Sequence, residues 1–343
     1  MWFVVFVTSL LHAQQEPQYA LSQFNHLIIN PAYTGMRSGT SVLLQSRQQW
    51  IGNLGPLGPK TYAFSAHGSK KSLGLGMHVI SDQIGARNKV QYGLNVAYHL
   101  KLNSRSILSF GMSAAAKQYQ FKRPDFFFKN EEALLLNFNS QQLLNIDGGI
   151  YFKSDRTFMS LSATQLNAGQ FSLNASSTNA PLTYIIEPHY IAMAGHAFVI
   201  SDQLVLSPVI QMRYTRSSWN ADMQLHVMYG KRLSTGMYYR YNNAFGILCQ
   251  YLSTNGLRIG YCFEINPMHY SYLGTTHEIG LGFDLGTLKT PQAATDAGKV
   301  GPLFLDFYDE KGVFGFLLLD FRVCTIPNPA AKSAYIIPVW NVY

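Results

Sequence analysis

The sequence predicts an all-β fold, a transmembrane antiparallel β-barrel of about fourteen strands. Composition, a two-residue alternation of apolar and polar side chains, and the lengths of the links between strands all point to it. Of the 343 residues, 14% are aromatic and only 13% are charged, and the 28 glycines suit strands and turns. No uninterrupted apolar run approaches the roughly 18 to 20 residues of a membrane helix. A membrane crossing would therefore be made by strands.

Residues 1–13 are expected to be a signal peptide. The apolar run from Trp2 to Leu11 is too short to span a bilayer as a helix, and it precedes the polar stretch QQEPQ, as a cleavable signal does. We expect cleavage near Ala13 and export. No Lys or Arg precedes the run, which leaves open a weak signal or a different start codon.

The alternation is clearest in VQYGLNVAYHL, residues 90–100, and returns in SLGLGMHVI and EIGLGFDL. Many such segments run to ten residues or more, the length that a tilted membrane strand needs. The predicted strands begin near Ser41, Lys60, Ser72, Lys89, Arg105, Leu143, Arg156, Pro188, Asp202, Ser218, Ser234, Ala244, Asn255 and Thr275.

In each strand the apolar row should face lipid and the alternate row should face the lumen, because unpaired polar groups are not tolerated in hydrocarbon. Glycines in the inward row leave space beside the wall. The predicted lumenal residues are Gly74, Gly76, His78, Gln91, Asn95, His99, Gln224, His226, Arg240, Gln250, Arg258 and Glu278.

Links of two lengths alternate along the chain. Short ones such as GSKK, LNSR and KSD follow even-numbered strands, and longer ones such as QQWIGNLGPLGP, SDQIGARN and NPMHYSYLG follow odd-numbered strands. The short link YNNAF breaks the pattern. Outer-membrane barrels have short periplasmic turns and longer external loops. Both chain ends of the barrel, where the first strand begins and the last strand ends, are therefore expected in the periplasm. In SDQIGARNK, Asp82 and Lys89 form either a partner-binding charge pair or part of a solvated loop.

No motif predicts catalysis, a cofactor or a metal site. The stretch GLGMHV lacks the third glycine of a dinucleotide loop, and the ten histidines have no zinc-type spacing. A barrel lipase would need a Ser-His pair on the outer wall, and no segment marks a nucleophile. The net charge of +8 is spread along the chain, so we expect no nucleic-acid partner.

The stretch FNHLIINPAYTG, residues 24–35, is expected to fold into or against the periplasmic mouth. Asn30 precedes Pro31, which ends any helix there, and the apolar side chains need burial. Burial of about 1.5 to 3 kcal/mol for each of a few side chains is offset by ordering costs of about 1 to 2 kcal/mol per residue, so docking should be marginal. The alternative is an ordinary first strand or linker. The candidate gate or partner-binding residues are Phe24, Ile28, Ile29, Asn30, Pro31, Tyr33 and Trp50.

An ordered set of segments resembles the PorP/SprF family of outer-membrane proteins. The set includes QYALSQFNHLIINPAYTG, RQQWIG, LGLGMHVISDQIG, NIDGGIYFKSDRTFMSLSATQLN and THEIGLGFDLG, and it extends over roughly Pro17 to Gly286. The resemblance implies a barrel without enzyme activity that serves type IX secretion or gliding motility. It implies as partners a large surface adhesin with a type B C-terminal sorting domain, other type IX components and outer-membrane lipid. It does not separate a PorP-like role in the secretion machinery from a SprF-like role in adhesin secretion or retention.

The expected organisation is a signal peptide over residues 1–13, a periplasmic or plug segment over 14–40, a barrel over 41–286 and a periplasmic extension over 287–343. A hairpin within the extension would raise the strand number to sixteen. The competing function is a FadL-like outer-membrane transporter of hydrophobic small molecules. An apolar lumen would favour that transporter, and a polar lumen favours a protein-binding barrel.

Overall fold

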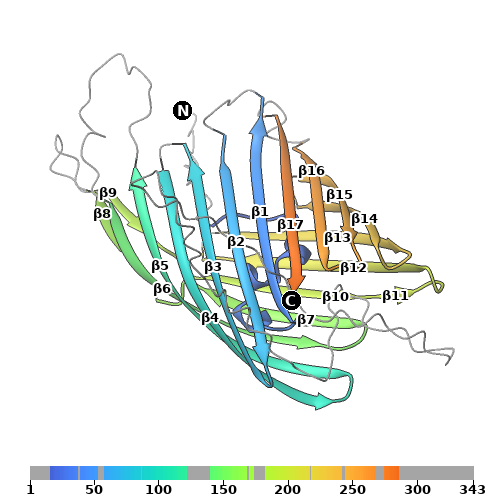
Figure 1. Cartoon of the computed structure of the whole chain (residues 1–343). Coiled ribbons are helices and arrows are strands. Elements are labelled where there is room, and N and C mark those ends of the chain that lie inside the picture. Colours follow the sequence, from blue (N-terminus) through green and yellow to red (C-terminus); the bar gives the residue numbers. More distant parts are fainter. Residues whose placement is uncertain are drawn as a thin grey trace, which may run out of the picture.

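The computed structural model is a closed antiparallel β-barrel around a short helical segment (Figure 1). It describes residues 16–37, 39–52, 58–85, 87–121, 140–167, 170–173, 182–216, 218–241, 244–266 and 274–285. Fourteen strands form the wall, which closes where β1 (Thr40–Ile51) pairs with β17 (Thr275–Leu285). The predicted signal peptide and the predicted extension over 287–343 lie outside the described residues.

The remaining wall strands follow one another around the barrel. They are β2 (Lys60–Lys70), β3 (Leu73–Ile84), β4 (Arg87–Asn103), β5 (Ser106–Phe121), β6 (Gln141–Lys153), β7 (Thr157–Thr164), β10 (His189–His196), β12 (Leu204–Tyr214), β13 (Trp219–Tyr229), β14 (Leu233–Arg240), β15 (Ala244–Leu252) and β16 (Leu257–Ile265). Each predicted strand start lies within two residues of an observed one. The short strand β11 (Phe198–Val199), which pairs with β12, and the hairpin of β8 (Gln170–Leu173) and β9 (Leu182–Ile185) were not predicted.

The wall has fourteen strands and not sixteen. Strand β1 pairs with β17 continuously from Thr40↔Leu285 to Gln48↔His277. A further hairpin has no gap between these two strands to enter, so the described strands close the barrel by themselves.

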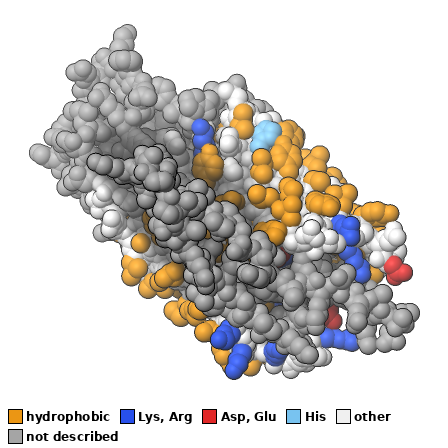
Figure 2. Space-filling view, viewed as in Figure 1, with side chains coloured by type: hydrophobic (Ala, Val, Ile, Leu, Met, Phe, Trp, Pro, Cys, Tyr) orange, Lys and Arg blue, Asp and Glu red, His pale blue; other side chains and the backbone are white. Residues whose placement is uncertain are grey.

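The two faces of the wall differ sharply in chemistry. On β4, Leu94 is 72% exposed whereas the next residue, Asn95, is 4% exposed. The same alternation gives an outer surface of Leu, Met, Ile, Phe and Tyr side chains (Figure 2). An exposed apolar belt of this extent matches the lipid-facing surface of a membrane barrel. None of the helices within the described part of the chain has the length and apolarity needed to cross a membrane.

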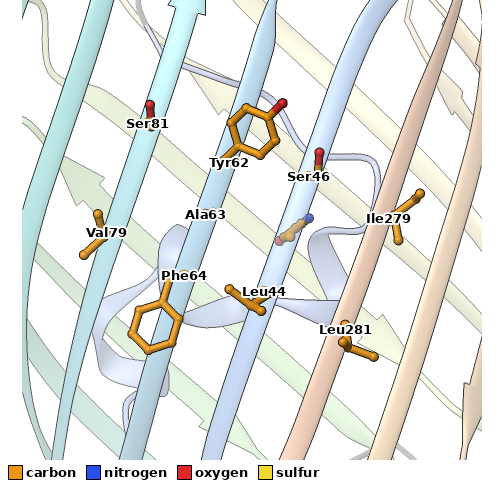
Figure 3. A pocket seen from close by; sticks show the side chains of 10 residues that line it. Leu44, Ser46, Tyr62, Ala63, Phe64, Val79, Ser81, Ile279 and Leu281 are labelled. Atoms are coloured by element: carbon orange, nitrogen blue, oxygen red, sulfur yellow. The ribbon is translucent and has the colours of Figure 1, made fainter. Parts of the chain in front are cut away.

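Two apolar depressions lie on the described part of the outer wall. One has a volume of about 410 Å³ and lies between Leu44, Phe64 and Leu281 on neighbouring strands (Figure 3). The other, of about 660 Å³, lies over β7, β10 and β12 to β15 and is lined by residues such as Met159, Pro208 and Met237. Both belong to the lipid-facing belt, so neither is the candidate functional site.

Links of different lengths distinguish the two ends of the barrel. The strand ends that border the links at residues 52–59, 122–140, 165–188 and 266–274 lie at one end, called here the long-link end. The turns at 71–72 and 104–105 mark the opposite, short-turn end. The prediction of a long link in SDQIGARN was wrong. Strands β3 and β4 pair up to Ile84↔Arg87, so only two residues separate the paired strands here.

Candidate functional site in the barrel lumen

The lumen is occupied by residues 16–37, called here the lumenal segment. It contains η1 (Ser22–Phe24), α1 (His26–Ile29) and η2 (Pro31–Tyr33), visible in dark blue inside the barrel in Figure 1. Glu16 lies beside Lys89 near the long-link end, and Arg37 lies beside Asp284 at the short-turn end. The segment therefore runs along the barrel and extends further than the mouth location that was predicted.

The turn at Asn30 and Pro31 fixes the path of the segment. Asn30 ends α1 in an extended conformation with φ −143° and ψ 116°, as expected for a residue before proline. The Ala32 N–H donates to Asn30 Oδ1 at 2.8 Å, which caps η2. The Asn30 amide nitrogen also lies 3.0 Å from the carbonyl oxygens of Ile150 and Leu161 on the wall. One side chain thus shapes the segment and binds it to β6 and β7.

Inward glycines let the segment approach the wall backbone. A Cβ placed on Gly149 would overlap the Asn30 carboxamide, and one placed on Gly111 would overlap the backbone at Pro31 and Ala32. Any larger residue at either position would displace the turn. The space predicted beside the glycine-rich wall is filled by the chain's own N-terminal segment.

Apolar side chains of the segment pack in three groups. Ile29 and Tyr33 are buried in a cluster with Tyr151 and Phe158 of the wall. Ile28 is half-buried and packs against a second cluster that contains Tyr19. Phe24 is also buried, and the Arg258 guanidinium carbon lies 5.1 Å from the centre of its ring. This geometry is typical of a cation–π contact.

Wall side chains bind the backbone of the segment at several points. Ser162 Oγ donates to the Ile29 carbonyl at 2.8 Å, and Ser109 Oγ donates to the Ala32 carbonyl at 2.7 Å. Further contacts join Gln224 to the Ala20 carbonyl, the Gly35 N–H to His67, and the Ala20 and Leu21 N–H groups to Glu278. Backbone groups are common to every residue, so these contacts recognise a polypeptide more than a particular side chain.

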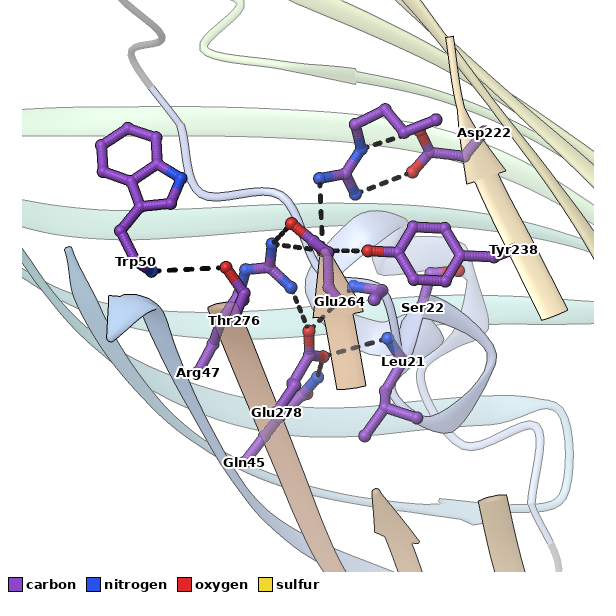
Figure 4. Close-up of polar contacts among 12 residues, drawn as sticks. Leu21, Ser22, Gln45, Arg47, Trp50, Asp222, Tyr238, Glu264, Thr276 and Glu278 are labelled. Carbon is purple, nitrogen blue, oxygen red and sulfur yellow. Dashed lines mark hydrogen bonds and ion pairs between the residues drawn. The ribbon is translucent and has the colours of Figure 1, made fainter. Parts of the chain in front are cut away.

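Glu278 belongs to a buried charge network (Figure 4). Its carboxylate and that of Glu264 each lie 2.8 Å from the Arg47 guanidinium, and all three side chains are almost fully buried. Arg240 lies on the other side of Glu264 and pairs with Asp222 at 2.9 Å. Buried charges require such partners, because an unpaired buried ion costs several kcal/mol. The network therefore holds the segment and the wall together.

A second ion-pair group fixes the other end of the segment. Arg37 Nη2 lies 2.8 Å from Asp284 Oδ2, and Arg258 Nε lies 3.1 Å from the same oxygen. Asp284 is on β17, one residue before the end of the last described strand. The segment is therefore anchored by charge just before the chain enters β1.

The first described residue, Glu16, is held by two lysines. Its carboxylate oxygens lie 2.7 Å from Lys89 Nζ and 2.7 Å from Lys117 Nζ. Burial alone would raise the pKa of the Glu16 carboxyl, but the ion pairs with Lys117 and Lys89 outweigh it and lower the pKa well below the ordinary value of 4.5. Asp82 and Lys89 do not form an external loop pair or a solvated loop, because both are buried on strands. Asp82 instead binds Thr61 and Arg87.

The structure places the predicted lumenal residues inside the barrel, and some of them contact the segment. Glu278, Arg258 and Gly74 lie against it. His78 and Gln91 bind each other at 2.8 Å instead. Gln224 also contacts the segment, through the Ala20 carbonyl. The other predicted members with buried positions are Asn95, His99, His226, Arg240 and Gln250, and Gly76 lies partly exposed beside Thr34.

Of the candidate gate residues, six lie in the segment and Trp50 does not. Trp50 is at the long-link end of β1, where its backbone N–H lies 3.4 Å from Thr276 Oγ1 (Figure 4). Glu16, Arg37, Ser109 and Ser162 were not among the predicted site residues. Each of the two serines lies at an inward position of its strand, so the alternation of inward and outward residues could have identified it. The ion pairs of Glu16 and Arg37 join residues far apart in sequence and had no local signal. The prediction of marginal docking weighed only apolar burial against the cost of ordering the segment, and it did not include these polar contacts.

Several solved structures of bacterial proteins are distantly similar to the chain. The Ralstonia pickettii toluene transporter TbuX is 12% identical, with a TM-score of 0.46 and coverage of 76% of this chain and 93% of that chain. A Pseudomonas aeruginosa FadL homologue is 10% identical, with a TM-score of 0.44 and coverage of 79% and 95%. These similarities are distant. No curated protein matches the chain.

The family comparison covers most of the barrel and the lumenal segment. The family described as "Type IX secretion system membrane protein PorP/SprF" matches residues 11–283. The match includes the turn at Asn30 and Pro31, the wall strands up to residue 283 of β17, and the network around Glu278. With this match and an outer-membrane type of barrel, the chain belongs to the PorP/SprF family of type IX secretion system membrane proteins.

Proposed function

We propose that this barrel supports the secretion or surface anchoring of a partner adhesin with a type B C-terminal sorting domain, and that it does so without catalysis. The observation that supports the proposal is the set of wall side chains that bind the backbone of the lumenal segment. A lumen that holds one polypeptide by its backbone has the chemistry to hold another. The segment then acts as a gate that the partner displaces.

The polar lumen is the reason to prefer a polypeptide over a hydrophobic compound. A transporter of hydrophobic compounds needs an apolar passage, because burying an unpaired charge beside an apolar ligand is unfavourable. Here Arg47, Glu264 and Glu278 lie inside the wall and the segment fills the space beside them.

The gate is tested by replacing both Ile28 and Ile29 with Ser. Loss of apolar burial should loosen the segment while the wall strands and their pairing remain. We expect a heat-modifiable, membrane-inserted barrel whose adhesin secretion or surface retention differs from that of the parent. Ile200→Ser serves as the control, because Ile200 is 61% exposed in a link and outside the segment. A double variant that assembles and handles its adhesin like the parent would reduce the segment to a linker.

The proposal includes an orientation, with the short-turn end, where the first wall strand begins at Thr40 and the last ends at Leu285, in the periplasm. Cysteines placed at exposed Ser104, in a short turn, and at exposed Arg216, in the link between β12 and β13, report on the two ends. A membrane-impermeant maleimide should label the Arg216→Cys variant in intact cells and the Ser104→Cys variant only after permeabilisation. The opposite labelling pattern would reverse the orientation.

A further inference from the structure

The contacts of Glu16 have the geometry of a bound ligand. Each carboxylate oxygen lies 2.7 Å from a different lysine ammonium group, Lys89 or Lys117. The Gln165 side-chain amide also donates to this carboxylate. A carboxylate bound through both oxygens to separate cationic donors is a strong and directional arrangement.

The two lysines are built into the wall and depend on this carboxylate. The side chain of Lys89 is 0% exposed and that of Lys117 is 3% exposed. The nearby carboxylates are engaged elsewhere, since Asp82 accepts hydrogen bonds from Thr61 and Arg87, and Asp147 accepts them from Asn145 and Gln165. Withdrawal of Glu16 would leave two buried ammonium groups close together without their main counter-ion, which is unfavourable.

Adjacent contacts indicate that the site accommodates a peptide. The Pro17 carbonyl accepts a hydrogen bond from Arg213 at 3.4 Å, and the Ala20 N–H donates to Glu278 at 2.9 Å. The acidic side chain and the backbone that follows it are therefore bound together. A small free anion would use only part of this surface.

We propose that Lys89, Lys117 and Gln165 form a carboxylate-binding site for an acidic side chain of the partner polypeptide, and that Glu16 occupies this site in the absence of that partner. This inference rests on the proposed function, because it assumes that a partner displaces the lumenal segment. Displacement then exchanges one carboxylate for another and never leaves the lysines unpaired. The site lies near the long-link end, since Lys89 is close to the start of β4 and Gln165 directly follows β7.

The site itself is tested by chemical rescue of a variant without the acidic side chain. The Glu16→Ala variant of the full chain is purified in detergent, and its thermal midpoint is measured in sodium acetate and in sodium chloride of equal ionic strength. Acetate supplies the missing carboxylate, so we expect a saturable rise of the midpoint above the chloride series. The parent should show no such rise, and a Glu16→Ala, Lys117→Met double variant should lose it. If the alanine variant does not fold, the Glu16→Ser variant, which also leaves room for acetate between the two lysines, is used in its place.

An equal acetate response in the parent or in the double variant, or no response in either Glu16 variant, would refute the site. The partner assignment is tested separately with a Lys89→Met, Lys117→Met variant in cells. Its recovery of copurified adhesin should fall about tenfold or more, as expected for the loss of a charge-assisted contact. Normal recovery together with acetate rescue would overturn the partner assignment but not the proposed function. The proposed function itself is judged by the Ile28 and Ile29 double variant.

Discussion

The Glu278 carboxylate on β17 accepts a hydrogen bond from the backbone N–H of Leu21 in the lumenal segment at 3.0 Å. The same carboxylate binds Arg47 on β1, so one side chain joins the segment to both strands that close the barrel. Glu278 therefore contributes both to closure of the barrel wall and to docking of the lumenal segment.

Replacing Glu278 with Gln should destabilise the barrel by about 1 to 3 kcal/mol, because the amide supplies one acceptor oxygen and no charge for four buried donors, the Ala20 and Leu21 N–H groups and the Gln45 and Arg47 side chains. Hydrogen exchange over residues 19–22 should increase in the same variant, measured by mass spectrometry of the detergent-solubilised protein. Glu264→Gln is the matched control, since Glu264 pairs with Arg47 without contacting the Ala20 or Leu21 N–H groups. It should lower the thermal midpoint and leave exchange in the segment unchanged. Equal exchange in both variants would contradict a direct role for Glu278 in docking.

Gly149→Ala should loosen the turn at Asn30, because the added Cβ would overlap the Asn30 carboxamide. Overpacking of this kind costs about 1 to 3 kcal/mol. Gly148→Ala is the neighbouring control, where a Cβ would meet only Leu166 at an ordinary distance of 3.5 Å. Thermal midpoints and hydrogen exchange over residues 26–33 should change for the first variant only. Similar results at both positions would mean that close approach of Asn30 does not constrain β6.

Leu94→Arg should cost about 2 to 4 kcal/mol, whereas Leu102→Arg should cost only about 0 to 1 kcal/mol. Both residues face outward on β4, but Leu94 lies near mid-strand and Leu102 lies near the short-turn end. The apolar centre of a bilayer penalises a charge more than its interface does. Reversible unfolding in lipid vesicles measures the difference. Equal costs at the two positions would show that this face does not cross the bilayer.

Acid should weaken the docking of Glu16. The pKa of its carboxyl is lowered in the folded protein, so its stabilising contribution is fully present above the ordinary value of 4.5 and is lost as pH falls below that value. The thermal midpoint of the parent should therefore fall more steeply than that of Glu16→Gln as the pH is lowered from about 5 to about 3, the range in which carboxyl groups ordinarily titrate. The Gln variant has no charge at this position to lose. Parallel curves for the two proteins would show that Glu16 makes no ion pair in solution.

Much of the wall was predictable because alternation is a local signal. A membrane strand repeats its pattern every two residues, so the strands that begin at Lys60, Ala244 and Thr275 could be located from the sequence to the residue. The lumenal segment was only partly predictable. Asn30 and Pro31 mark a turn locally, but the partners of Glu16 and Arg37 lie far away in the sequence, and nothing near either residue indicates them. Strand β11 was missed because it contains only Phe198 and Val199.

The direction of the lumenal segment has a consequence for assembly. Arg37 is at the short-turn end and β1 starts at Thr40, while Glu16 reaches the long-link end. If the hoop of strands formed first, the segment would have to thread lengthwise through a finished ring. If the sheet instead curls around the segment, the same contacts can form before the seam between β1 and β17 is sealed. The segment would then serve as a template around which the sheet closes. Its enclosure and the pairing of β1 with β17 would be a single step in biogenesis.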